Sequence, residues 1–194
     1  MSAVDDLPPA DQLTYWVGAL AREDLSLESR VRWLFTGLVG MANPARALFP
    51  TEVKRAMDMC NAMLPNVRDA PSWFVIEGKA ALRFAGEAHS ERNRYIHDVL
   101  SPTPESPDRW VRHRAATLTN PAPAPTYVTL DSLRQCRDDL LRAAWRVRGV
   151  SLCLGAILDP FPSEEEQNDE LASGLGIMRG EFELMNDRGG IIHY

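Results

Sequence analysis

The chain has 194 residues, of which 45% are hydrophobic and 25% charged, as in an ordinary globular domain with a substantial core. No apolar run approaches the roughly 18 residues that a bilayer-spanning helix needs, and the acidic, proline-containing start "MSAVDDLPPADQ" is unlike a signal peptide. The sequence therefore predicts a cytoplasmic protein that does not enter a membrane.

The net charge of −6 is confined to one part of the chain. Residues 163–194 contain eight acidic residues and two arginines, whereas residues 1–162 contain 19 acidic and 19 basic residues. Arginine supplies 19 of the 21 basic residues. It suits bidentate contacts with phosphate, although a biased genomic composition gives the same ratio. Since the chain has no overall basic excess, any polyanion must be bound locally.

Three helices are expected before residue 65. Apolar residues recur at helical spacing over about residues 11–20, 26–39 and 51–64. The N-caps expected for these helices are Asp11, Ser26 and Thr51. Four large side chains on these helices and the next are expected in the core: Trp16, Trp33, Met57 and Trp73.

A long helix is predicted from Trp73, with Ser72 as its cap, to about Leu100; it is either continuous or broken near Gly78 or Gly86. Its core-facing residues are expected to be Ile76, Ala80, Phe84 and Ala88. Residues 101–130 contain six prolines and form an irregular insert, in which "DRWVRHRAATLT" and "TYVTL" can pair as a small β-hairpin. A last helix is expected from its cap Asp131 to about residue 159.

The fold class predicted is an all-α bundle of four or five helices with a proline-rich insert before the last one. Residues 1–162 are expected to form this domain. Residues 163–194 are expected to be an acidic linker, "SEEEQNDE", and a glycine-rich tail that is either disordered or docks on a partner. The docking residues of that tail are Met178, Phe182, Leu184 and Met185.

The three cysteines are far apart and form no C-x-x-C pair. Cys60 and Cys153 lie on apolar stripes, where a reduced cysteine acts as a small hydrophobic residue. We therefore expect no disulfide framework, no structural zinc site and no cofactor.

The stretch "AHSERNRYIHDVLSPTP", residues 88–104, places Arg92, Asn93 and His97 in the last turns of the long helix. Asn93 and His97 lie about 40° apart around a helix and roughly 6 Å apart along its axis. The long side chain of Arg92 can bend toward the same region. A planar cation, a titratable imidazole and an amide that orients either one form a candidate phosphate site. The alternative is an ordinary solvated helix end whose histidine is stabilised by the helix dipole.

The pattern Arg92-Asn93-x-x-x-His97 resembles the R-x(4–6)-H motif of the HEPN superfamily, in which a polar residue follows the arginine. The resemblance implies a helical domain that dimerises through this helix and cleaves RNA without a metal ion, by attack of the 2′-hydroxyl on the adjacent phosphorus. It assigns Arg92 to the phosphate, His97 to proton transfer and Asn93 to orienting either of them. The expected neighbours are Glu91, Arg94 and Tyr95. Bacterial family members are often toxins or defence proteins, so a cognate antitoxin is a further expected partner.

Several alternatives stay open at this point. A second R-x4-H match, Arg188 to His193, lies in the glycine-bearing tail without a polar residue after the arginine, and we take it as a chance match. His89 is expected to be structural or to support the site. His113, among arginines and near Trp110, either contacts RNA by charge and stacking or lies on an ordinary exposed hairpin. The whole chain can also be a non-catalytic HEPN-like module for dimerisation or partner binding.

Overall fold

The computed structural model describes residues 4, 6–40, 50–103, 106–113, 124, 126–159, 163–181, 183–185 and 191–193. Its helices are α1 (Pro9–Val39), α2 (Val53–Met63), η2 (a 3-10 turn, Leu64–Asn66), α3 (Ser72–His97), α4 (Leu130–Leu158) and α5 (Glu164–Arg179). Its strands are β1 (Val99–Thr103), β2 (Ser106–His113), β3 (Thr126–Thr129), β4 (Glu183–Met185) and β5 (Ile191–His193). The prediction of a mainly helical chain is confirmed, with a small sheet added.

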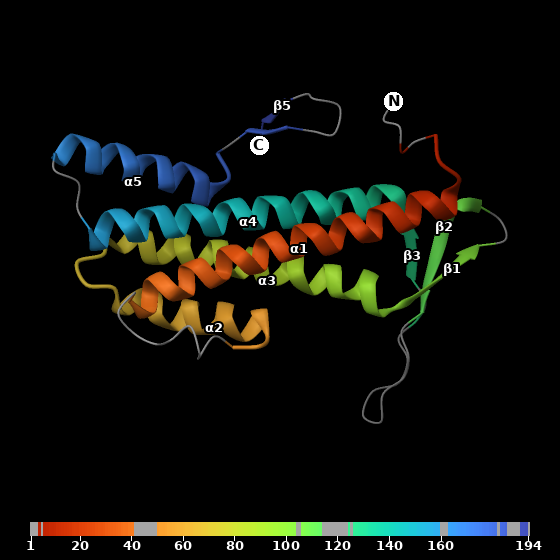
Figure 1. The fold of residues 1–194 in the computed structure, drawn as a ribbon, viewed down its shortest axis with the longest axis horizontal. Coiled ribbons are helices and arrows are strands. Elements are labelled where there is room, and N and C mark those ends of the chain that lie inside the picture. The colour runs from red at the N-terminus through yellow and green to blue at the C-terminus, as the bar shows by residue number, and fades with distance from the viewer. Residues whose placement is uncertain are drawn as a thin grey trace.

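The long helices α1, α3 and α4 pack together along the length of the molecule (Figure 1). The short helix α2 packs on α1 and α3, and α5 packs mainly on α4. The core lies between these helices and includes the fully buried side chains of Leu27, Phe74, Leu140 and Val147. Among the described residues, no helix is both long and apolar enough to cross a membrane.

Helix α1 runs without a break through residues 11–39, so the predicted helix start at Ser26 is wrong. No glycine or proline occurs between residues 19 and 36, and a serine inside a helix costs only a few tenths of a kcal/mol. Continuity places residues 20, 24, 27 and 31 on one buried stripe of α1, and residue 24 of this stripe is an aspartate, Asp24.

The other predicted caps also shift. The N-cap of α4 is Thr129 rather than Asp131, because the Thr129 and Ser132 side chains each accept a hydrogen bond from the other's backbone N–H. The residues at the N-cap positions of α1, α2 and α3 are Pro8, Glu52 and Pro71. Side-chain caps therefore do not fix the starts of these three helices.

The predicted core is partly correct. Trp16 and Met57 are buried and Trp73 is partly buried, but Trp33 is 68% exposed and Ile76 65% exposed. All three cysteines are buried and free. On α3, Ala88 is buried, whereas Phe84 packs at the edge of the core.

The proline-rich insert contains a three-stranded antiparallel sheet with the order β1-β2-β3. Helix α3 ends at His97, before the predicted end at Leu100, because the backbone is extended from Asp98 onward. Trp110 lies opposite Val128 in the sheet, and both are buried. The sheet therefore packs its inner face on the bundle, at the end where α3 finishes and α4 begins (Figure 1).

The acidic run "SEEEQNDE" is part of helix α5 rather than a linker. Ser163 accepts a hydrogen bond from the Glu166 N–H, and the glutamates of the first turn are favourable at a helix N-terminus. Met178 is fully buried, so it is a core residue and not a docking residue. Phe182 and the side chains of Leu184 and Met185 lie outside the described residues.

Candidate functional site

A groove of about 860 Å³ lies beside the last turns of α3, between α1 and the start of α2. Its lining includes the three residues of the predicted site, Arg92, Asn93 and His97. The other described lining residues are Asp24, Leu25, Glu28, Thr51, Glu52, Val53, Lys54, His89, Ser90, Arg94 and Asp98. The structure thus places the predicted site residues on one concave surface.

Four polar side chains form a closed network at the base of this groove. Asp24 Oδ1 lies 2.7 Å from His89 Nδ1, and Asp24 Oδ2 lies 3.3 Å from Arg92 Nη2. Arg92 Nη1 donates to Asn93 Oδ1 at 2.7 Å. Asn93 Nδ2 lies 3.0 Å from His89 Nε2, which closes the ring. We call these four residues, Asp24, His89, Arg92 and Asn93, the Asp24 network.

The direction of each hydrogen bond in the Asp24 network follows from the arginine, which can only donate. Arg92 fixes Oδ1 of the Asn93 amide as the acceptor, so Nδ2 is the donor toward His89. His89 Nε2 must then accept, and the imidazole carries its proton on Nδ1, where it donates to Asp24. With the His89 proton on Nδ1, each donor in the network faces an acceptor, so the network holds each side chain in a defined orientation.

Burial makes the Asp24 network costly to break. The Asp24 side chain is 8% exposed, and those of His89 and Arg92 are 14% and 16% exposed. A buried carboxylate needs a cation and hydrogen bonds to offset its lost hydration, and Asp24 has both. Arg92 uses two of its five N–H groups in the network, and its Nε is buried with no partner. The remaining N–H groups on Nη1 and Nη2 are the donors left for a ligand.

His97 differs from this network although it lines the same groove. It is exposed, and it makes no hydrogen bond or ion pair with any residue that the structure describes. It is also the last residue of α3. Its imidazole is therefore accessible to a ligand or to a second protein surface.

The three predicted neighbours of the site have different surroundings. Arg94 pairs with Glu91 at 2.6 Å, and Glu91 also lies 3.5 Å from Arg112 of β2. Tyr95 is buried beneath Arg112, whose guanidinium lies 5.6 Å from the ring centre. Burial raises the pKa of the Tyr95 hydroxyl above its ordinary value, which keeps it protonated. Glu91 and Tyr95 thus connect α3 to the sheet, and only Arg94 lines the groove.

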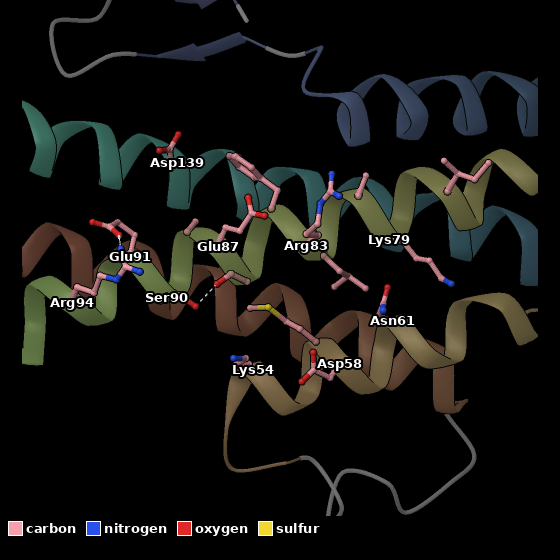
Figure 2. A pocket seen from close by; sticks show the side chains of 17 residues that line it. Lys54, Asp58, Asn61, Lys79, Arg83, Glu87, Ser90, Glu91, Arg94 and Asp139 are labelled. Atoms are coloured by element: carbon pink, nitrogen blue, oxygen red, sulfur yellow. Dashed lines mark hydrogen bonds and ion pairs between the residues drawn. The ribbon is translucent and has the colours of Figure 1, made fainter. Parts of the chain in front are cut away.

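A second groove, of about 1020 Å³, continues from the first along α2 and α3. Lys54, Ser90 and Arg94 line both grooves. Figure 2 shows its charged side chains, which come mostly from these two helices. Four cations (Lys54, Lys79, Arg83, Arg94) face four acids (Asp58, Glu87, Glu91, Asp139). The formal charges of this lining cancel.

Asp24 is not among the site residues predicted from the sequence, and for His89 the sequence allowed either a structural or a supporting role. Both residues continue an apolar helical stripe: Asp24 lies between Leu20 and Leu27 on α1, and His89 follows Ala85 on α3. A charged or polar residue on a buried stripe needs a polar partner, and this signal was present in the sequence. Asp24 and His89 are 65 residues apart in the sequence, and they meet because α1 packs against α3.

Within the described part of the chain, no group of three or more His, Cys, Asp or Glu side chains is arranged to hold a metal ion. The fold and the groove define a helical protein with a small antiparallel sheet and a polar groove that carries an ordered arginine and an accessible histidine. Comparison with family models, curated proteins and solved structures gave no match to this chain.

Proposed function

We propose that this chain is an HEPN-like endoribonuclease that acts as a dimer and needs no metal ion. The observation that supports it is one groove that holds Arg92, fixed by the Asp24 network, and His97, which has no partner among the described residues. An ordered guanidinium suits a phosphate, and a free imidazole suits proton transfer near neutral pH. A toxin or defence role with a cognate antitoxin belongs to the same proposal.

The reaction assigned is transesterification of RNA. A base takes the proton of the 2′-hydroxyl, whose oxygen attacks the adjacent phosphorus, while an acid gives a proton to the departing 5′-oxygen. The products are a 2′,3′-cyclic phosphate and a 5′-hydroxyl. The outer N–H groups of Arg92 stabilise the charge that develops on the phosphorane oxygens. Asn93 keeps the guanidinium in place through its Oδ1.

Among the described residues, one chain supplies one free histidine, His97, to the groove, whereas the reaction needs an acid and a base. In a two-fold dimer formed at the end of α3, His97 of each copy serves the other as the second proton-transfer group. The exposed position of His97 at the end of its helix is compatible with such pairing.

The test is RNA cleavage in the presence of EDTA by the wild type and by the Arg92→Ala and His97→Ala variants. We expect each variant to lose about 100-fold or more of the cleavage rate. The matched control is His193→Ala, which removes the histidine of the other R-x4-H match and should leave the rate unchanged. Cleavage that persists in both variants, or depends on added metal, contradicts the proposal.

A second candidate is a non-catalytic HEPN-like module that dimerises or binds a protein partner. Two observations favour it. The described groove lining carries four carboxylates (Asp24, Glu28, Glu52, Asp98) against three permanent cations (Lys54, Arg92, Arg94). Leu25, at the groove edge, is 65% exposed, and Trp33, two turns further along α1, is 68% exposed.

Light scattering of the wild type and of Leu25→Ser and Trp33→Ser, combined with the cleavage assay on the wild type, separates the two candidates. If either substitution abolishes association while the wild type never cleaves RNA, the module is the better assignment. Truncation before α5 is a poorer test, because it removes the buried Met178 from the core.

A further inference from the structure

The solvent-facing side of the β1-β2-β3 sheet carries an exposed aromatic ring between two basic side chains. Tyr127 of β3 lies opposite Val111 of β2, so Arg109 and His113, two residues either side of Val111, are its diagonal neighbours on the same face. Tyr127 is 70% exposed, and Arg109 and His113 are exposed as well. We call Tyr127, Arg109 and His113 the Tyr127 platform.

The opposite face of the sheet is not available for binding. Trp110 is 3% exposed and packs on the bundle, so it cannot stack on a ligand as the sequence suggested. Arg112, on this inner face, lies 3.5 Å from both Glu91 and Asp98. Arg109 and His113, on the outer face, make no ion pair with the described residues. None of the described side chains on this outer face is acidic.

We propose that the Tyr127 platform binds single-stranded RNA, with a base stacked on Tyr127 and phosphates held by Arg109 and His113. An unpaired base offers its flat face to an aromatic ring, whereas the bases of a duplex are already stacked on each other. Arg109 supplies the positive charge that attracts the backbone. The lining of the groove has no excess of permanent cations, so affinity for RNA has to come from outside it.

The Tyr127 platform lies close to the groove. Strand β1 begins at Val99, two residues after His97, and Val99 lies opposite His113. Two strand spacings across the sheet and two residues along it place Tyr127 roughly 12 Å from Val99, measured between Cα atoms. One RNA strand can reach from the platform to the groove within a few nucleotides. This step rests on the proposed function, since it makes the platform the substrate-binding part of the nuclease.

The experiment measures fluorescence anisotropy of a labelled oligouridylate with the full chain carrying His97→Gln, so that bound RNA is not cut. Adding Tyr127→Ala should weaken binding about 5- to 100-fold, and Tyr127→Trp should retain it. Arg109→Ala should weaken binding and reduce its salt dependence. The control is Tyr15→Ala, which removes another exposed tyrosine, 41% exposed, on α1. The labelled strand within a duplex should bind more weakly than when it is single.

Unchanged binding in Tyr127→Ala, or no binding of oligouridylate by the parent, overturns the Tyr127 platform. The cleavage assay separates this result from failure of the nuclease. RNA binding that needs Tyr127 without any cleavage by the wild type keeps the platform and removes the nuclease. Cleavage that needs Arg92 and His97, with RNA binding unaffected in Tyr127→Ala, keeps the nuclease and removes the Tyr127 platform. Unchanged thermal unfolding of Tyr127→Ala shows that the variant is folded.

Discussion

Arg92 and His97 lie five residues apart on one helix and line one groove, yet they differ in burial and in hydrogen bonding. Arg92 is held from two sides, by Asp24 of α1 and by Asn93. His97 is exposed at the helix end and bonds to no described residue. The guanidinium is therefore fixed before any ligand arrives, while the imidazole is free to meet one.

This difference decides what each residue can report in an experiment. A change at Arg92 disturbs both a buried ion pair and the candidate site, so a loss of activity there has two possible causes. A change at His97 touches only the candidate site. The two residues therefore separate folding from function, and the predictions for Asp24→Ala and His97→Gln make that separation measurable.

The largest effect is expected for Asp24→Ala, which should lower the free energy of unfolding by about 3–5 kcal/mol. The substitution leaves the positive charge of Arg92 and the Nδ1 proton of His89 without their buried partner. Urea denaturation followed by circular dichroism measures the change. Glu28→Ala is the control on the same helix, because the Glu28–Arg32 pair is exposed and should cost about 1 kcal/mol or less. Equal losses in the two variants would mean that the Asp24 network does not stabilise the fold.

Much of this arrangement could be predicted from helical periodicity. The stripes on α2 and α4 and the end of α3 near the prolines follow from local rules, and these elements are found within a few residues of their expected places. The predicted stripe of α3 shares only Ala88 with its buried face, which is formed instead by residues such as Phe74, Leu82 and Ala85. The exposed positions of Trp33 and Ile76 do not follow from those rules. Hydrophobicity alone does not say which apolar side chains find a partner, because that depends on how the helices pack.

The candidate site shows the same limit. The groove brings together Arg92, Asn93 and His97, which are local in the sequence, and the sequence could propose them as a set. Asp24 comes from another helix, and only the packing of α1 on α3 makes it the partner of His89 and Arg92. Likewise, strand pairing rather than composition puts Trp110 inside the sheet and Tyr127 outside it.

Above pH 8, the pH dependence of the free energy of unfolding should depend on the buried thiols of the core and not on the residues of the groove. Burial raises the pKa of the Cys60 thiol to about 12, whereas an unfolded cysteine titrates at about 8.5. Between these values the unfolded chain loses the proton first, so the free energy of unfolding should fall as pH rises, by up to about 1.4 kcal/mol per pH unit from this thiol. The pKa values of Cys136 and Cys153 are raised to about 12 in the same way.

Urea denaturation between pH 8 and pH 10 tests this slope in the wild type and in Cys60→Ala. The variant should show a shallower fall, whatever its stability at neutral pH. Met57→Ala, a truncation of a buried neighbour that does not titrate, should keep the slope of the wild type. Parallel profiles for the wild type and Cys60→Ala would show that this thiol does not control alkaline stability.

The smallest change in stability is expected for His97→Gln, within about 0.5 kcal/mol of the wild type. The imidazole is exposed and contributes no hydrogen bond or ion pair within the described chain, so its loss leaves no buried group unsatisfied. The same substitution should lower RNA cleavage about 100-fold or more, because glutamine can donate a hydrogen bond but cannot carry a proton between oxygens. Thermal unfolding and the cleavage assay are measured on one preparation.

The value of this variant lies in the pairing of its two results. Full stability with lost cleavage shows that His97 takes part in the reaction and does not stabilise the fold. Asp24→Ala should differ, because its main effect is a loss of stability. Full stability with unchanged cleavage would remove His97 from the chemistry and contradict the proton-transfer role proposed for it, and His89 could not replace it in its present hydrogen bonds because both of its ring nitrogens are bonded. If the wild type itself shows no cleavage, the ordered arginine serves only to bind an anion or to brace α1 against α3, and the non-catalytic module is the better description.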